Sequence, residues 1–216
     1  MKYQAVLFDL DGTVVDTLQD ICNAVNVAMR RFGLPDWDRD TLKHHLGYGV
    51  DSLMRRIHPE LTEEARAEML RFYRPWYAAH SGDLSAPFEG ILPMMRELKR
   101  MGLPLGIVSN KPDSALRPLT DKYFSGLVDY AAGETEGVRK KPCPDMLEIA
   151  AREMRVSLRK CLYVGDSEVD IDTSRNAGMD CVCVTWGFRT REELIRSGAR
   201  TIIDRPEELI SFVRSV

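Results

Sequence analysis

The sequence predicts an α/β protein, with a Rossmann-like parallel sheet as its core and an all-helical cap inserted after the first strand. Three observations support this fold class. Residues 4–8 form a short apolar run of the kind that is buried on both faces of a parallel sheet. Residues 16–85 show helical periodicity alone. From residue 86 onward strand and helix patterns alternate, which is typical of βαβ units.

The segment after the first strand predicts helices only. Apolar residues recur at helical spacing from Leu18 to Phe32, with Asp16 or Thr17 as the N-cap and Gly33 as the stop signal. Further helical patterns lie near residues 40–46, 50–57 and 62–79. A linker rich in Gly, Ser and Pro at 81–90 leads back to the sheet. We therefore expect a core domain at residues 1–15 and 86–216, and a helical cap domain at residues 16–85.

The second half of the chain predicts the rest of the sheet and its covering helices. The predicted helices lie at residues 90–101, 113–123, 144–154, 169–177, 190–197 and 206–214. The predicted strands lie at residues 103–108, 127–131, 161–164, 181–185 and 201–203. Because each strand is followed by a helix, the strands are expected to run parallel, with the opening strand in the same sheet.

Composition and charge exclude several classes of protein. The 216 residues are 44% hydrophobic and 29% charged, with a formal net charge of −3, so no overall positive field favours nucleic acid or anionic membranes. The apolar run near the start is too short for a signal peptide or a membrane span. Five cysteines without a C-x-x-C pair indicate a reduced, cytoplasmic protein. The sequence leaves the oligomeric state open.

Polar side chains follow the predicted strands where each strand ends. Asp9 and Asp11 come directly after the first strand, Ser109 follows the strand at 103–108, and Asp166 follows the strand at 161–164. Lys141 precedes the helix at residues 144–154. The carboxyl ends of parallel strands meet at one edge of a sheet, which is where ligands bind in α/β proteins. These side chains are therefore expected to share one site.

The residue types at this edge indicate a metal and a phosphate. A period of two places Asp9 and Asp11 on the same side of the chain, and Asp166 arrives from another strand. Three converging carboxylates need a hard cation, and oxygen ligands suit Mg²⁺, which often shares a phosphate ligand. Lys141 and Ser109 would then hold that phosphate.

Taken singly, these motifs have simpler interpretations. The run from Asp9 to Thr13 is equally well a polar turn, the run from Gly165 to Ser167 is a common capped helix start, and Lys140 with Lys141 is more often a solvated pair. His44 and His45 are ambiguous between exposed residues and residues that face the site. It is the joint pattern that favours a catalytic site.

Taken together in chain order, the motifs resemble those of the haloacid dehalogenase superfamily of phosphotransferases, and the resemblance covers essentially the whole chain. The matching residues are Asp9–Thr13, Ser109, Lys141 before Pro142, and Gly165–Asp170. Residues 16–85 resemble the helical cap of that family. Three further runs, at residues 109–112, 141–145 and 186–188, resemble its phosphoglycolate phosphatase branch. Ser109 stands where many relatives have threonine, and either hydroxyl can donate to a phosphate oxygen.

The resemblance implies roles for the acidic residues. Asp9 would attack phosphorus and become an aspartyl phosphate. Asp11 would protonate the leaving oxygen and later deprotonate water. Mg²⁺ would be held by Asp9, by the backbone carbonyl of Asp11 and by Asp166, while Asp170 would orient metal-bound water.

The resemblance also implies roles for the phosphate ligands. Lys141 would neutralise charge between Asp9 and the phosphoryl group. Ser109 and Asn110 would bind the phosphate together with Asp9 and Lys141.

The expected function is that of a Mg²⁺-dependent phosphatase for a small phosphorylated metabolite, with 2-phosphoglycolate as the first candidate. A pyrophosphatase or a sugar-phosphate mutase of the same family is the alternative. A phospho-accepting signalling module is an alternative of another class, because receiver domains also gather acids and a lysine over a parallel sheet. Such a module needs no helical insertion, whereas a phosphatase uses one to exclude water and select its substrate.

Overall fold

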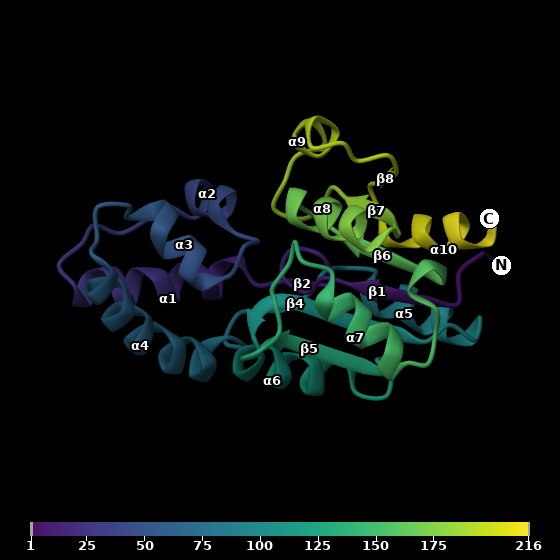
Figure 1. Ribbon diagram of the computed structural model, residues 1–216, viewed down its shortest axis with the longest axis horizontal. Coiled ribbons are helices and arrows are strands. Elements are labelled where there is room, and N and C mark those ends of the chain that lie inside the picture. The colour runs from purple at the N-terminus through teal and green to yellow at the C-terminus, as the bar shows by residue number, and fades with distance from the viewer. Residues whose placement is uncertain (1, 216) are drawn as a thin grey trace.

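The computed structural model describes residues 2–215 and contains a six-stranded parallel sheet with helices on both faces (Figure 1). The strand order is β5-β4-β1-β6-β7-β8. The strands are β1 (Ala5–Phe8), β4 (Leu105–Pro112), β5 (Tyr130–Glu134), β6 (Cys161–Gly165), β7 (Asp180–Val184) and β8 (Ile202–Ile203). The predicted α/β fold with a parallel sheet is confirmed.

Strand β1 lies in the middle of the sheet because all four of its residues are apolar and fully buried. Its last residue, Phe8, pairs with Ile107 of β4 and with Val164 of β6. This register brings the residues that follow the three strands to the same edge. Asp9 therefore leaves the sheet between the end of β4 and the end of β6.

The two faces of the sheet are covered by different helices, and alternate residues of β1 point to opposite faces. Val6 and Phe8 pack in one apolar cluster with α5 (Ile91–Arg100), α6 (Asp113–Phe124) and α10 (Pro206–Ser215). Ala5 and Leu7 pack on the other face against α7 (Asp145–Glu153). Two further helices, α8 (Glu168–Ala177) and α9 (Arg191–Arg196), pack against Cys183 of β7.

The helical insertion comprises α1 (Leu18–Arg31), α2 (Arg39–Leu42), a 3₁₀ turn at Lys43–His45, α3 (Val50–Ile57) and α4 (Glu63–His80). Figure 1 shows these helices grouped together beyond one end of the sheet. They have an apolar cluster of their own, which includes the fully buried side chains of Met29, Leu42, Met54 and Met69. The helical periodicity read in the sequence is thus explained by burial within this group.

The two connections to the insertion form a short antiparallel sheet that the sequence pattern does not predict. Strand β2 (Val15–Asp16) pairs with β3 (Ala86–Pro87). Two residues are too few to show a strand period, and the partner is distant in sequence. Asp20, at the start of α1, adds to the connection by accepting hydrogen bonds from the backbone of Leu84 and Ser85.

Two strands, β4 and β5, differ from their predicted ranges by more than one residue. Strand β4 continues through Ser109 to Pro112, because Pro112 pairs with Glu134 after an irregularity in the β4–β5 register. Strand β5 begins at Tyr130, while the apolar residues expected to start it, near Leu127, pack against the core as a loop. No helix in the described part of the chain is long and apolar enough to cross a membrane.

Candidate active site

Three buried carboxylates converge at the carboxyl edge of the sheet. Oxygens of Asp9, Asp166 and Asp170 all lie within 4.8 Å of one another. Asp9 follows β1, Asp166 follows β6, and Asp170 lies in the first turn of α8. Asp9 and Asp166 were expected to meet. The period of two had suggested Asp11 as the third carboxylate of the cluster. In the structure the third carboxylate is Asp170.

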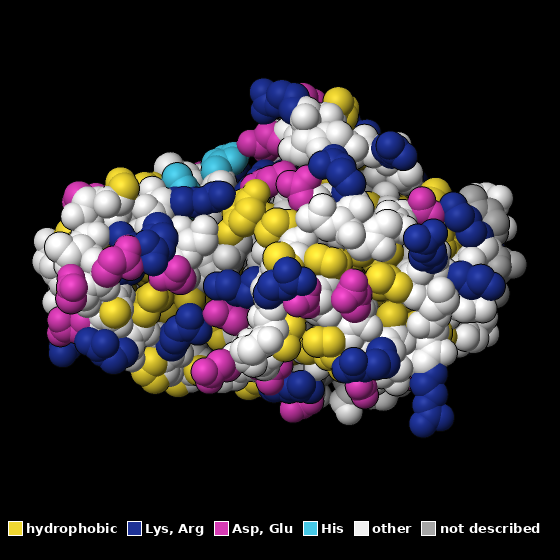
Figure 2. Space-filling view, in the orientation of Figure 1, with side chains coloured by type: hydrophobic (Ala, Val, Ile, Leu, Met, Phe, Trp, Pro, Cys, Tyr) yellow, Lys and Arg dark blue, Asp and Glu magenta, His cyan; other side chains and the backbone are white. Residues whose placement is uncertain are grey.

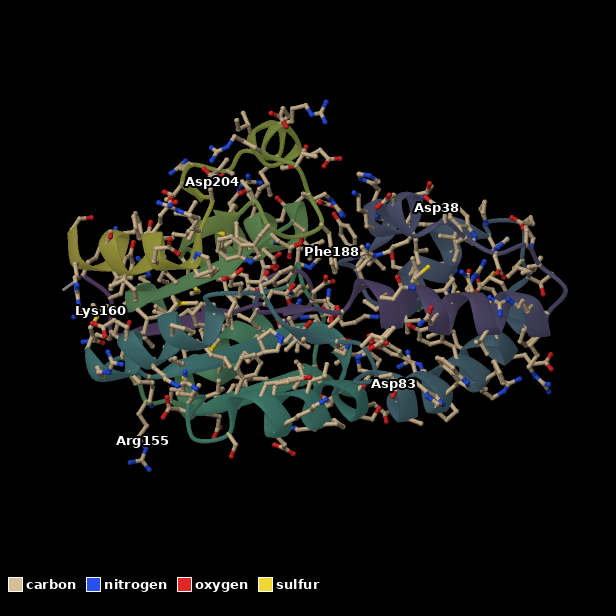
Figure 3. The ribbon with its side chains drawn as sticks, turned by 180° about the vertical axis from the view of Figure 1, so that it is seen from behind. Asp38, Asp83, Arg155, Lys160, Phe188 and Asp204 are labelled. Carbon is tan, nitrogen blue, oxygen red and sulfur yellow. The ribbon has the colours of Figure 1, made fainter. Side chains whose placement is uncertain are left out.

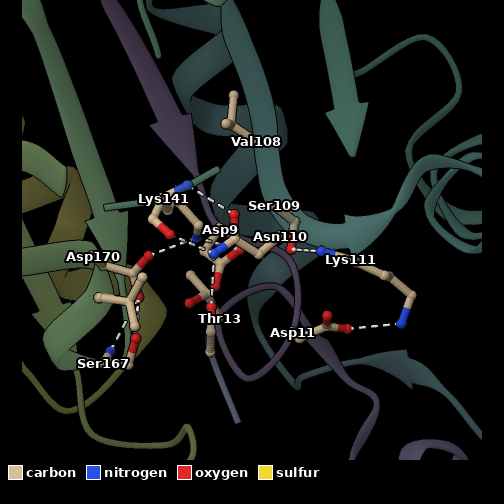
Figure 4. Close-up of polar contacts among 12 residues, drawn as sticks. Asp9, Asp11, Thr13, Val108, Ser109, Asn110, Lys111, Lys141, Ser167 and Asp170 are labelled. Atoms are coloured by element: carbon tan, nitrogen blue, oxygen red, sulfur yellow. Dashed lines mark hydrogen bonds and ion pairs between the residues drawn. The ribbon is translucent and has the colours of Figure 1, made fainter. Parts of the chain in front are cut away.

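Lys141 compensates part of the negative charge of this cluster. Its Nζ lies 2.9 Å from Asp9 Oδ1 and donates to Asp170 Oδ1 at 2.8 Å and to the hydroxyl of Tyr163 at 3.0 Å (Figure 4). Only 1% of the side chain is exposed. Burial opposes the charged form, but Asp170 and Asp9 outweigh it and raise the pKa of Lys141. The ammonium group therefore stays charged.

Burial without full charge compensation raises the pKa values of two of the acids. Desolvation raises the pKa of Asp9 to about 7, with Lys141 opposing the shift and Asp170 adding to it. Desolvation and the neighbouring Asp170 and Asp9 raise the pKa of Asp166 to about 8. One lysine beside three carboxylates leaves an excess of negative charge that a cation would stabilise.

The oxygens of the cluster fit a hard divalent cation. Asp9 Oδ1 is buried and accepts no hydrogen bond, although it forms an ion pair with Lys141 Nζ at 2.9 Å. Asp166 is held on both oxygens, by Thr13 Oγ1 at 2.9 Å and by the backbone N–H of Phe188 at 2.7 Å. An all-oxygen set in which one buried oxygen accepts no hydrogen bond suits Mg²⁺.

Asp170 supports the other groups of the site. Its Oδ2 accepts from the backbone N–H groups of Asp166 and Ser167 and from Ser167 Oγ at 2.8 Å, and its Oδ1 accepts from Lys141. All of its oxygens are thus engaged in holding the loop after β6 and the lysine. This arrangement suits a residue that positions other groups.

Two glycines allow the chain to close around Asp166. Gly12 has a φ of +82°, and a Cβ there would lie 2.4 Å from Asp166 Oδ2. A Cβ at Gly187 would lie 2.3 Å from Asp166 Cβ. Neither position tolerates a side chain without moving the carboxylate. A turn within the run from Asp9 to Thr13 was one interpretation of the sequence, whereas the close approach of Gly187 depends on a contact distant in sequence.

Asp11 lies outside the carboxylate cluster and is paired with a second buried lysine. Lys111 Nζ donates to Asp11 Oδ1 at 3.0 Å and also to the hydroxyl of Tyr77, which belongs to α4 (Figure 4). Strand β1 ends at Phe8, so the period of two does not extend to Asp11. The Asp11 side chain therefore points toward the helical insertion.

Ser109 and Asn110 line the same cavity, but their polar groups have different surroundings. Ser109 is buried, and its Oγ accepts from the backbone N–H of Lys111 at 3.3 Å. The Asn110 side chain donates to the backbone carbonyls of Gly47 and Lys141 and accepts from the Lys141 N–H. Asn110 thereby connects the insertion to the Lys141 loop. Phosphate binding by these two residues stays a prediction.

The site opens into a cavity of about 60 Å³ between the sheet edge and the insertion. From the insertion it is lined by two glycines and by Ile21, Leu46, Val50, Leu53, Tyr73 and Tyr77. Lys43, His44 and His45 are not among the described residues that line it, and His44 instead contacts Glu193. Figure 3 places Phe188, another lining residue, between the sheet and the insertion.

Several residues of the site could not be recognised as site residues from the sequence. Tyr163 lies inside an apolar strand, and Thr13 had been assigned to the turn alone. Lys111 belongs to the run at residues 109–112 but had no role of its own. Arg189 bridges Glu168 to backbone carbonyls of the insertion. Only contacts between distant segments identify these residues.

The chain is similar to known proteins over almost its whole length. Residues 6–184 match the family model described as haloacid dehalogenase-like hydrolase. The chain is 30% identical to a phosphoglycolate phosphatase of Colwellia psychrerythraea, covering 96% of this chain and 95% of that protein. It is 29% identical to an N-acetylmuramic acid 6-phosphate phosphatase of Pseudomonas aeruginosa, covering 99% and 96%.

A solved structure supports the same relationship. The crystal structure of a protein of Lactobacillus delbrueckii subsp. bulgaricus, provisionally named a phosphoglycolate phosphatase, superposes with a TM-score of 0.94 at 35% identity, covering 99% of each chain. The motifs, the fold and these comparisons agree, and the chain belongs to the haloacid dehalogenase-like hydrolase family, within which it resembles the phosphoglycolate phosphatases.

Proposed function

We propose that this enzyme is a Mg²⁺-dependent phosphatase that hydrolyses a small phosphate monoester through an aspartyl phosphate on Asp9, with 2-phosphoglycolate as the first candidate substrate. The observation that carries the proposal is the buried Oδ1 of Asp9, which forms an ion pair with Lys141 and accepts no hydrogen bond. A desolvated carboxylate oxygen that accepts no hydrogen bond and lies beside an ammonium group is suited to attack a phosphoryl group that the same ammonium group also contacts. The choice of 2-phosphoglycolate as the first candidate substrate rests on the similarity to phosphoglycolate phosphatases.

In the proposed first step, an oxygen of Asp9 forms a bond to phosphorus as the bond to the leaving oxygen breaks. Asp11 gives its proton to that oxygen, so the product leaves as an alcohol. In the second step Asp11 takes a proton from water, which attacks the phosphorus and regenerates the carboxylate of Asp9. Lys141 and Ser109 stabilise the phosphoryl charge in both steps.

Mg²⁺ belongs to the proposal as a bound ion held by Asp9, the backbone carbonyl of Asp11, and Asp166. When bound it would neutralise negative charge on the carboxylates and on the phosphoryl group. Asp170 would keep Lys141 and the loop after β6 in place, consistent with its three contacts to that loop.

We further propose that residues 16–85 act as a cap on a core formed by residues 1–15 and 86–216. The cap would exclude water and limit the size of the substrate. A cavity of about 60 Å³ with a mainly apolar cap wall is consistent with a small ester. The similarity to a phosphatase of a phosphorylated amino sugar makes a larger sugar phosphate the second candidate.

The proposed setting is the reducing cytoplasm, with a small phosphorylated metabolite as partner and neither nucleic acid nor membrane. All five cysteines are free thiols. Figure 2 shows basic and acidic side chains interspersed on the visible face, without a continuous basic surface. The oligomeric state stays open.

A panel of phosphate esters tests this proposal. Purified protein is incubated with 2-phosphoglycolate, N-acetylmuramic acid 6-phosphate, a hexose phosphate and pyrophosphate, and released phosphate is measured with Mg²⁺ and with excess chelator. We expect Mg²⁺-dependent release that is fastest with 2-phosphoglycolate. Full activity in chelator would refute the metal requirement. Isomerisation of the hexose phosphate without phosphate release would indicate a mutase, and a stable phosphoprotein would indicate a signalling module.

A further inference from the structure

The cavity contains a second buried lysine that the proposed chemistry does not use. The Lys111 side chain is 1% exposed, and its Nζ contacts Asp11 Oδ1 and the hydroxyl of Tyr77. An ammonium group has three donors. Within the described residues only these two hydrogen-bond partners are present, so one donor is available to a ligand. A buried cation with spare donor capacity beside a reaction site is suited to binding an anion.

The other cations near the site are already committed. Lys141 is shared among Asp9, Asp170 and Tyr163. Arg189 uses four of its five N–H donors on Glu168 and on the backbone carbonyls of Lys43 and Leu46, so its position is fixed by the contact with the insertion. Within the described part of the chain, Lys111 is therefore the lysine that lines the cavity without being assigned to the phosphoryl group or to a contact between the core and the insertion backbone.

The cap wall of the cavity cannot supply a positive charge. Its side chains are aliphatic residues and the two tyrosines Tyr73 and Tyr77. Burial raises the pKa of Tyr77 well above its usual value, so its hydroxyl stays neutral. A negative charge on the leaving group would consequently have to meet a cation on the core side, where Lys111 and Arg189 line the cavity.

The order of the side chains defines where such a charge would lie. Figure 4 shows Lys141 and Asp170 on one side of Asp9, and Asp11 and Lys111 on the other. In the proposed function the phosphoryl group contacts Asp9 and Lys141, and the leaving oxygen faces Asp11. The next group of the substrate would then reach Lys111, whose Nζ lies 3.0 Å from Asp11 Oδ1.

We propose that Lys111 is a specificity-determining residue that binds a carboxylate on the leaving group, one carbon from the ester oxygen. Tyr77 holds the lysine from the cap side, so the carboxylate is bound when the cap is closed. This inference rests on the proposed phosphatase function and goes further, because it assigns recognition of the leaving group to a core residue and not to a charged cap residue.

A pair of non-hydrolysable ligands tests the assignment without turnover. Calorimetry in Mg²⁺ compares 3-phosphonopropionate, the analogue of 2-phosphoglycolate, with propylphosphonate, which lacks the carboxylate. We expect the wild-type protein to bind 3-phosphonopropionate at least about tenfold more tightly, because a buried charge-assisted hydrogen bond is among the stronger polar contacts. In Lys111→Met the two affinities should agree within about twofold.

Two further variants serve as controls. Lys140→Met removes a neighbouring, partly exposed lysine that pairs with Glu134 outside the cavity, and it should keep the wild-type ratio. Lys111→Arg retains the charge and should keep part of the preference, which covers the case in which Lys111→Met fails to fold.

The remaining outcomes overturn the assignment. An unchanged ratio in Lys111→Met, or an equal loss for both ligands, would mean that Lys111 has a structural role only. Equal affinities of the wild-type protein for the two ligands would show that Lys111 does not recognise a carboxylate. Binding of methylenediphosphonate that is stronger than binding of 3-phosphonopropionate would show the same. Phosphate release from small esters, measured on the same preparations, shows separately whether the proposed phosphatase function stands.

Discussion

At the scale of single residues, the site separates two aspartates that are only two positions apart. Asp9 is buried beside Lys141, and its pKa is raised to about 7 by desolvation. Asp11 is partly exposed and paired with Lys111 on the cavity side. The different surroundings give each carboxylate its own proposed task, attack on phosphorus for Asp9 and proton transfer for Asp11.

The nucleophile is tested by Asp9→Asn. The amide keeps the shape of the side chain but is a poor nucleophile and a weaker Mg²⁺ ligand. We expect turnover to fall by more than about a thousandfold, a barrier change on the order of 4 kcal/mol, with the fold retained by circular dichroism. Phosphate release close to that of the wild type would remove Asp9 from this role.

The acid is tested by Asp11→Asn with two leaving groups. An alkoxide needs a proton to leave, whereas nitrophenolate leaves readily without one. The variant should lose about a hundredfold or more on 2-phosphoglycolate and much less in the first step on p-nitrophenyl phosphate. Rapid-quench kinetics should show a burst of nitrophenol and a trapped phosphoenzyme. Equal losses without a burst would leave Asp11 with a metal-binding role alone.

At the scale of elements, the insertion is anchored where its two connections meet. Strands β2 and β3 pair there, and Asp20 of α1 accepts hydrogen bonds from Leu84 N–H, Ser85 N–H and Ser85 Oγ. Asp20 and Ser85 are 2% and 3% exposed, so the two Ser85 donors have little access to water as a replacement. This contact ties the start of the first inserted helix to the return linker.

Asp20→Ala tests this anchor. Loss of the carboxylate leaves the two buried donors of Ser85 unpaired, so we expect the free energy of unfolding to fall by at least about 2 kcal/mol, or Tm to fall by about 4–8 °C. Thermal denaturation with Asp83→Ala as the matched control checks this. The Asp83 side chain is 59% exposed, and its removal should cost less than about 0.5 kcal/mol. Similar shifts in both variants would argue against the anchor.

At the scale of the whole molecule, the fold concentrates negative charge at one buried point. Asp9, Asp166 and Asp170 are held together by a sheet and helices that do not depend on the site for their own packing. The pKa values of Asp9 and Asp166 are raised, to about 7 and about 8, chiefly by burial. A carboxyl group with a raised pKa in the folded state loses its stabilising contribution as the pH rises through that value.

The metal-free protein should therefore become less stable between pH 5 and pH 8, by at least about 1 kcal/mol, or 2–4 °C in Tm. Mg²⁺ should reverse this loss and stabilise more at pH 8 than at pH 5, because it pairs with ionised carboxylates. Thermal denaturation in chelator and in Mg²⁺ measures both effects. Asp9→Asn, which removes one titrating group, should show a flatter pH dependence, and a dependence as steep as that of the wild type would contradict this explanation.

The sequence by itself determined the alternation of strands and helices, the helical insertion and the family. It also indicated that Asp9, Lys141 and Asp166 belong to one site. These features follow from local periodicity and from the rule that parallel strands end at a common edge. Hydrophobic patterning over 5–15 residues is set by which face of an element is buried, so it can be read before the fold is known.

Only the tertiary structure decided which side chains meet beyond the strand ends. There Asp170 joins the carboxylate cluster, Asp11 turns to Lys111, and β2 pairs with β3. The direction of a side chain past the last strand residue depends on the turn at Gly12 and on packing against distant segments such as Gly187. No periodic pattern in the sequence encodes such contacts. They form between parts of the chain that come within a few ångströms of one another only when the sheet and the insertion have folded.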